Sequence, residues 1–174
     1  DRAGLDRIKQ HLRWAASLPA AGVDYETNGK RPYRRAARVL TAAVAGPGKS
    51  LAFPFDHPQA RWDAALRQEL QEAWIEFLNA PGVYKVVHNV PFEMEWTATL
   101  FDERCLLHSN WDDTMSQAFV LDERTGRGEG QRKDEQGPLS LDFLVRQYFG
   151  LALKKMSPMD KGNLANEPLE DVLR

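Results

Sequence analysis

The chain has 174 residues, 43% of them hydrophobic and 28% charged, and a formal net charge of −2. This size and composition predict one globular domain that buries roughly two-thirds of its surface. The charge gives no sign of nucleic-acid binding but does not exclude it, because metal ions and local basic patches can supply a positive field. The single cysteine, Cys105, excludes an internal disulfide and a cysteine-cluster zinc site and suits a reducing compartment.

The first part of the chain predicts a helix followed by three strands. Apolar residues recur at helical spacing over residues 4–17, and Pro19 ends this helix. An extended segment containing Asp24 and Glu26 follows, then a basic turn and two β-like runs at 38–44 and 50–55. These three strands are expected to form a meander.

The second part alternates helices and a strand. An apolar stripe predicts an amphipathic helix over 62–78, and the apolar run 83–87 predicts a strand that pairs parallel with the first sheet. Helices are expected at 91–101 and 113–121, at 141–149 between the caps Ser140 and Gly150, and from 169 onward. The polar, glycine-rich stretch 122–137 predicts a mobile loop. The pattern as a whole predicts an α/β fold with a mixed sheet.

Asp24 and Glu26 stand two positions apart in the first strand. Side chains of a strand alternate faces, so the two carboxylates point the same way, while Val23 and Tyr25 point the other way. Two carboxylates about 4 Å apart repel each other by about 4 kcal/mol at an effective dielectric near 20. The pair is tolerated if it is solvated, if one group is protonated, or if a divalent cation lies between them.

A second carboxylate pair follows the strand at 83–87, where Asn89 leads into a helix. Ends of strands that run into a helix N-terminus are common ligand sites in open α/β sheets. Glu93 and Glu95 lie about 200° apart around a helix, so only one of them can face such a site. The alternative is a surface helix whose first-turn glutamate is favoured by the helix dipole.

In this order, the motifs resemble the DEDD (DnaQ-like) 3′→5′ exonuclease superfamily and its ribonuclease-H-like fold. Asp24-x-Glu26 is similar to the first exonuclease motif and Asn89-x-x-Phe92-Glu93 to the second. The segments Trp111–Met115 and 140–151 resemble those that follow in the family. The likeness is strongest to the proofreading domain of family A, phage-type DNA polymerases.

The resemblance implies two-metal-ion hydrolysis of a DNA strand from its 3′ end, with release of nucleoside monophosphates. Mg²⁺ or Mn²⁺, two ions in all, would be the cofactor. The implied catalytic and metal-binding residues are Asp24, Glu26 and Glu93, and the implied substrate-binding residues are Thr27, Asn28, Asn89 and Phe92. The expected partners are a single-stranded DNA 3′ end and a polymerase domain downstream in the same chain.

Two features depart from the family pattern. Position 93 carries Glu where the family has Asp, and no tyrosine has an aspartate four residues later, so the third motif Tyr-x-x-x-Asp is absent. The segment 167–174 resembles the residues before that motif, so we expect a fragment of a longer chain. His108 and Asp113 have the spacing of a related subfamily, but they lie too early in the chain, and we interpret Asp113 as a helix cap.

Two other functions remain open: an inactive exonuclease-like scaffold or DNA-binding module, and a 3′→5′ exoribonuclease. The basic segment around Tyr33 (Lys30, Arg31, Arg34, Arg35 and Arg38) is either a solvated turn or a surface that holds single-stranded DNA. The sequence has no signal peptide and no apolar run of about 18 residues. We therefore expect a cytoplasmic location, in a bacterial or phage-infected cell, and no membrane partner.

Overall fold

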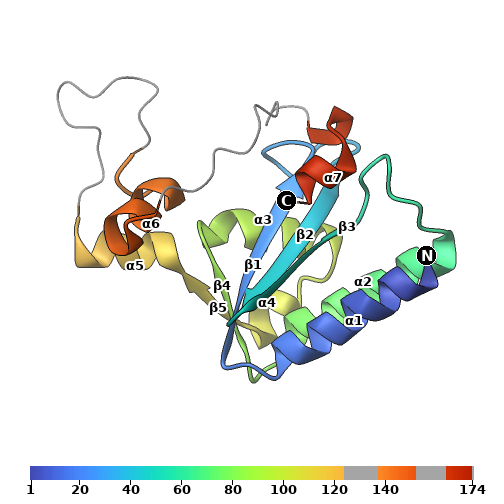
Figure 1. Cartoon of the computed structure of the whole chain (residues 1–174), viewed down its shortest axis with the longest axis horizontal. Helices are drawn as coiled ribbons and strands as arrows, with labels where there is room; N and C mark the ends of the chain where they lie inside the picture. Colours follow the sequence, from blue (N-terminus) through green and yellow to red (C-terminus); the bar gives the residue numbers. More distant parts are fainter. Residues whose placement is uncertain (124–136, 152–163, 174) are drawn as a thin grey trace.

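The computed structural model describes residues 1–123, 137–151 and 164–173 (Figure 1). The elements in chain order are α1 (Arg2–Ala16), β1 (Ala20–Thr27), β2 (Val39–Gly46), β3 (Lys49–Pro54), α2 (Ala64–Asn79), β4 (Tyr84–Val87), α3 (Val90–Leu100), α4 (Cys105–His108), β5 (Asn110–Asp113), α5 (Thr114–Leu121), α6 (Leu141–Phe149), the 3₁₀ turn η1 (Leu164–Asn166) and α7 (Leu169–Val172).

The five strands form one mixed sheet in the order β3-β2-β1-β4-β5. Strands β1, β2 and β3 make the expected antiparallel meander. Strand β4 lies parallel to β1, as the helix that connects them predicts, and β5 lies parallel to β4. The carboxyl ends of β1, β4 and β5 therefore meet at one edge of the sheet. The α/β class with a mixed sheet that the sequence predicts is confirmed.

One face of the sheet carries the core. Val23 and Tyr25 of β1 are buried there, and Trp74 of α2 is fully buried at the centre of a ring of aromatic side chains. The indole N–H of Trp74 donates to the Tyr25 hydroxyl at 3.0 Å, and that hydroxyl lies 3.0 Å from the hydroxyl of Thr97 on α3. Buried polar groups need such partners. The network joins β1, α2 and α3 around the buried Trp74.

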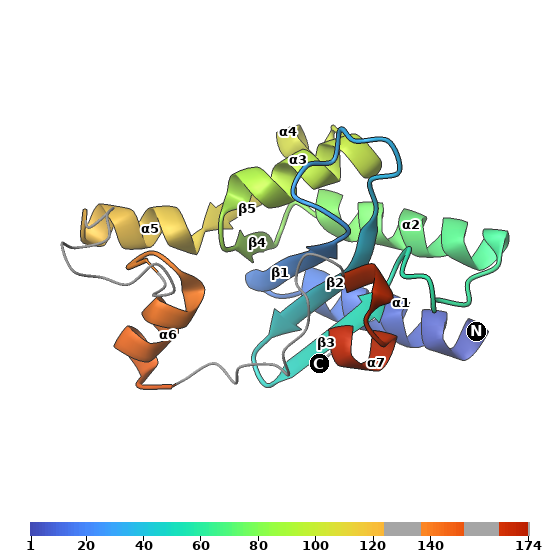
Figure 2. The same ribbon diagram turned by 90° about the horizontal axis from the view of Figure 1, so that it is seen from above.

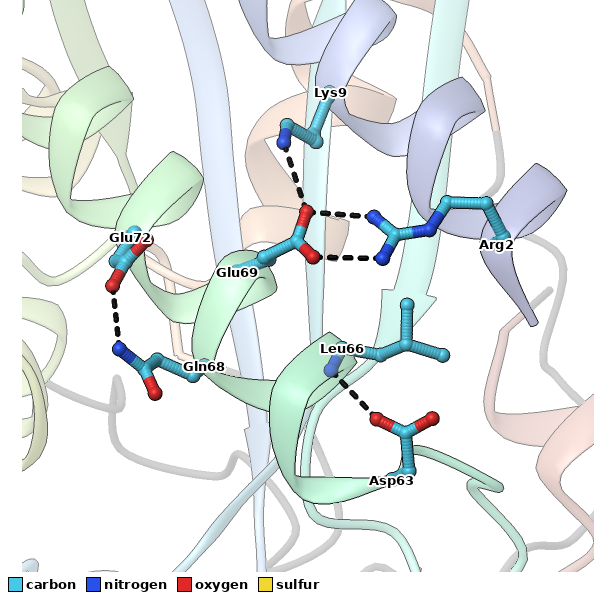
Figure 3. A network of polar contacts seen from close by, with 7 residues as sticks. All are labelled: Arg2, Lys9, Asp63, Leu66, Gln68, Glu69 and Glu72. Carbon is cyan, nitrogen blue, oxygen red and sulfur yellow. Dashed lines mark hydrogen bonds and ion pairs between the residues drawn. The ribbon is translucent and has the colours of Figure 1, made fainter.

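Helices α1 and α2 run side by side along the core face of the sheet (Figures 1 and 2). Glu69 of α2 accepts hydrogen bonds from Arg2 and Lys9 of α1 (Figure 3). The hydrogen bonds from Arg2 are the main reason that the pKa of Glu69 falls to about 2. Asp63 caps α2 by accepting from the backbone N–H of Leu66 (Figure 3).

The structure differs from the sequence prediction after α3. Residues 105–108 form the short helix α4, and residues 110–113, which were expected to lie in a connection or at the start of a helix, form the edge strand β5. Asp113 does cap α5, because its carboxylate accepts from the backbone N–H of Met115. Most of the predicted mobile loop, residues 124–136, lies outside the described residues. Within the part of the chain that the structure describes, no helix has the length and apolarity needed to cross a membrane.

Candidate active site

Asp24 and Glu26 lie on the face of the sheet opposite the core. Burial alternates along β1, with Val23 and Tyr25 buried, Asp24 exposed and Glu26 half-buried. This alternation confirms the predicted phase of the strand. On the neighbouring strand β2, Ala43 stands beside Asp24 and Thr41 beside Glu26.

A cleft of about 530 Å³ opens over this face. Its lining includes both carboxylates, His88 at the end of β4, Thr114 at the start of α5, and Val172 of α7. The cleft thus extends over the open face of the sheet and reaches the carboxyl ends of β1 and β4, where open α/β sheets bind ligands.

The turn from β4 into α3 has a constrained backbone. Asn89, the N-cap of α3, adopts a left-handed conformation with φ of 85°, which asparagine tolerates better than most residues. Its backbone N–H donates to the carboxylate of Asp113 at 2.8 Å. Burial opposes ionisation of Asp113, but this bond and those from Ser116 and Met115 outweigh it and lower the pKa of Asp113. Strand β5 therefore fixes the start of α3 through an ionised carboxylate.

Glu93 is the only one of the three predicted catalytic carboxylates that is buried. Its side chain is 3% exposed, and its Oε2 atom has no hydrogen-bond partner within the described part of the chain. Burial, with smaller contributions from the charges of Asp24 and Asp113, raises the pKa of Glu93 to about 8. Glu95, in contrast, points away and forms an ion pair with Arg31 at 3.2 Å. The two glutamates therefore lie on different sides of α3, as the helix phase predicts, but Glu93 is not among the residues that line the cleft.

The chemistry of these residues suits a divalent cation. Carboxylate oxygens are the preferred protein ligands of Mg²⁺, and a cation beside Glu93 would supply the partner that Oε2 lacks and offset the repulsion from Asp24. However, among residues 1–123, 137–151 and 164–173, no three His, Cys, Asp or Glu side chains are grouped so that they could hold a metal ion. The structure thus brings Glu93 within electrostatic reach of Asp24 without assembling a complete ligand set.

The predicted substrate-binding residues occupy different environments. Asn89 is exposed, and Phe92 is half-buried with its ring 6.0 Å from that of Trp96. Thr27 and Asn28 bond to their own loop: Thr27 donates to the carbonyl of Gly29, and the Asn28 amide donates to the carbonyl of Ala36. Thr27 and Asn28 therefore shape the loop, and neither Asn89 nor Phe92 is among the residues that line the cleft.

The sequence analysis gave no role to His88 or Thr114, and both line the cleft. The Thr114 hydroxyl donates to the carbonyl of Val87, so its oxygen accepts from Nδ1 of His88 at 2.9 Å. Nε2 of His88 is buried without a partner among the described residues, and in the neutral ring this arrangement leaves its lone pair available. The signal was present in the sequence, because His88 directly precedes Asn89 at the strand end.

A mixed α/β sheet with carboxylates at its strand ends is the architecture of ribonuclease-H-like nucleases. A family model described as 3′-5′ exonuclease matches residues 5–174. The chain belongs to this 3′-5′ exonuclease family, and the resemblance seen in the sequence is confirmed. No curated protein matches the sequence.

Solved structures share the fold at low sequence identity. Escherichia coli RNase D, an exoribonuclease involved in structured RNA processing, is 18% identical with a TM-score of 0.61, and the match covers 96% of this chain and 37% of that one. The catalytic core of RRP6 from Trypanosoma brucei is 16% identical with a TM-score of 0.63, covering 97% and 39%. Brucella melitensis NrnC with bound Mg²⁺ is 15% identical with a TM-score of 0.59, covering 85% and 60%.

Proposed function

We propose that the chain is a 3′→5′ exonuclease that hydrolyses the terminal phosphodiester bond of a nucleic-acid strand with the help of divalent cations. The observation that carries the proposal is the position of the family carboxylates. Asp24 and Glu26 line the cleft. The charge of Asp24 contributes to the raised pKa of Glu93, and Oε2 of Glu93 has no hydrogen-bond partner among the described residues.

Asp24, Glu26 and Glu93 would hold the metal. Two bound divalent cations would supply an activated water and stabilise the charge that develops on the leaving 3′ oxygen. Because the pKa of Glu93 is about 8 without metal, its carboxyl group must lose a proton before it can act as a ligand.

Other residues of the chain would position the substrate. The exposed amide of Asn89 offers a donor and an acceptor beside the cleft, held in place by the bond between its backbone N–H and Asp113. Phe92 offers an apolar surface for the terminal nucleotide. His88, with a lone pair on Nε2, would accept a hydrogen bond from water or substrate.

Two substrates remain candidates. The motif order resembles the proofreading domains of DNA polymerases, which favours a DNA 3′ end and a polymerase as the working partner. The structural likeness to RNase D and RRP6 favours an RNA 3′ end.

The test uses 5′-labelled single-stranded DNA and RNA of one sequence, incubated with the protein and Mn²⁺. The proposal predicts a ladder of products shortened one nucleotide at a time, and a 3′-phosphate block should stop it. Asp24→Ala and Glu26→Ala should each remove most of the activity, whereas Asp6→Ala, an exposed carboxylate on α1, should not. Shortening of DNA alone supports the polymerase candidate and shortening of RNA alone supports the exoribonuclease. If neither strand is shortened, the chain is an inactive module.

A further inference from the structure

We infer that the loop between β1 and β2, residues 28–38, is a stacking platform for a base of the single strand whose 3′ end enters the cleft. This inference deepens the proposed function and rests on it. The loop begins one residue after β1, the strand that carries Asp24 and Glu26, and none of the family motifs found in the sequence includes Tyr33.

Internal hydrogen bonds hold the loop in one shape. Asn28 acts as its hub: its amide donates to the carbonyl of Ala36, its side-chain oxygen accepts from the backbone N–H of Arg38, and its own carbonyl accepts from Arg34. Ala36 has a φ of 63°, a left-handed conformation that persists in a non-glycine residue only where the surroundings enforce it. A base that binds here would therefore not have to order the loop, which lowers the entropic cost of binding.

The absence of a side chain at Gly29 lets the end of the Arg34 side chain lie against the backbone of the loop. A Cβ atom there would lie 2.0 Å from the guanidinium group of Arg34. The Arg34 side chain thus folds back over the loop and, by donating to the carbonyl of Asn28, helps to hold its shape. This leaves three exposed cations of the loop whose side chains have no described role in its shape: Lys30, Arg35 and Arg38.

The loop also reaches α3. Arg31 bonds to both carboxylate oxygens of Glu95, at 3.4 and 3.2 Å. Glu95 lies two residues after Glu93, so the loop bridges the two elements that carry the predicted catalytic carboxylates. In Figure 2 the loop lies next to α3. A nucleic-acid strand held on the loop would therefore lie near the end of β1, where Glu26 lines the cleft.

Tyr33 provides the stacking surface. Its side chain is 68% exposed, although an aromatic ring normally gains free energy from burial. It lies between Lys30 and Arg35 along the chain, and an aromatic ring among cations is the arrangement by which proteins hold single strands: the cations contact phosphates and the ring stacks on a base. A duplex, whose bases already stack on one another, does not fit this surface.

The experiment measures binding without cleavage. A fluorescein-labelled oligothymidylate and the corresponding oligouridylate are titrated with the protein in EDTA, and the dissociation constant is read from anisotropy. We expect Tyr33→Ala to weaken binding about 5- to 100-fold and Tyr33→Phe to keep it, because stacking needs the ring and not the hydroxyl. Arg35→Ala should lower the slope of log K against log salt by about 0.7, the value for one phosphate contact on a single strand.

Tyr84→Ala is the matched control. Tyr84 is also exposed, at 52%, but it begins β4, beside Ala20 at the opposite end of β1 from the loop. Its removal should leave binding unchanged. A blunt duplex should show no dependence on Tyr33.

The outcomes separate this inference from the proposed function. Equal binding by wild type and Tyr33→Ala, equal losses from Tyr33→Ala and Tyr84→Ala, or no binding of either oligonucleotide would overturn the platform, even if the protein shortens strands in Mn²⁺. Tyr33-dependent binding by a protein that cleaves nothing would preserve the platform and overturn the exonuclease proposal.

Discussion

Glu93 combines three properties that a structural glutamate rarely has together. It is buried, one of its oxygens lacks a partner among the described residues, and it is close enough to Asp24 and Asp113 to feel their charges. Leaving a buried polar atom without a hydrogen bond costs about 1–3 kcal/mol. Such a cost is typical of positions at which a ligand supplies the missing contact.

The first prediction concerns the stability of the metal-free protein against pH. The pKa of Glu93 rises from 4.5 to about 8 on folding, so the folded state binds this proton more tightly than the unfolded state. Stability from this group is therefore fully present below pH 4.5, falls as the pH rises toward 8, and is flat above that. Urea unfolding in EDTA between pH 4.5 and 8 should show that the free energy of unfolding declines by on the order of a few kcal/mol. Glu93→Gln should remove most of it; an unchanged slope in this variant would contradict the assignment.

A second prediction compares the two glutamates of α3 in the nuclease assay. Glu93→Gln should reduce activity by at least about 100-fold, the upper end of the losses seen for residues that only support metal ligands. Glu93→Asp should retain activity, since it restores the carboxylate that the family carries. Glu95→Gln should change activity less than about 2-fold, because an exposed ion pair contributes only about 0–1 kcal/mol. Similar losses at 93 and 95 would show that the helix face is assigned wrongly.

The elements around the cleft are joined by the hydroxyl of Tyr25. This group links Trp74 of α2 to Thr97 of α3, one turn after Glu93 on the same helix. The position of Glu93 relative to β1 therefore depends on a buried network on the core side of the sheet.

The third prediction tests that network. Tyr25→Phe removes the hydroxyl and leaves the Trp74 N–H and the Thr97 hydroxyl without their partner, which should cost about 1–3 kcal/mol of unfolding free energy. Urea unfolding measures the loss. Tyr33→Phe, in which an exposed hydroxyl is removed, is the control and should be nearly neutral. A neutral Tyr25→Phe would mean that the network does not hold α3 against β1.

The elements also show what the sequence could and could not predict. The alternation at Asp24 and Glu26 and the phase of Glu93 follow from local periodicity, which is why both were predictable. Strand β5 was missed because Asn110 and Asp112 are polar and the strand has only four residues; its pairing with β4 is a tertiary effect. The structural role of Asn28 was missed for the same reason, since its partners lie 8 and 10 residues away.

At the scale of the whole molecule, the two faces of the sheet have different roles. Helices α1 and α2 cover the core face, while the opposite face carries the cleft, with α7 at one border (Figures 1 and 2). The carboxylates belong to β1 and α3, and Asp113 of β5 fixes the turn between β4 and α3. The described residues bring these groups near one another but form no complete metal site. If the proposed function holds, we expect a bound cation to draw these groups together and thereby to stabilise the fold.

The most direct test of the central claim, that Asp24, Glu26 and Glu93 are metal ligands, is the thermal unfolding midpoint of the protein against Mn²⁺ concentration. A ligand that binds only the folded state stabilises it by about 2.7 kcal/mol at a hundredfold excess over its Kd. We predict that Mn²⁺ raises the midpoint of the wild type and of Asp6→Asn, and that Asp24→Asn loses most of this rise. Mg²⁺ should give a smaller rise, because its stricter octahedral geometry tolerates an imperfect ligand set less well. An unchanged midpoint in the wild type, or an equal rise in Asp24→Asn, would contradict the claim.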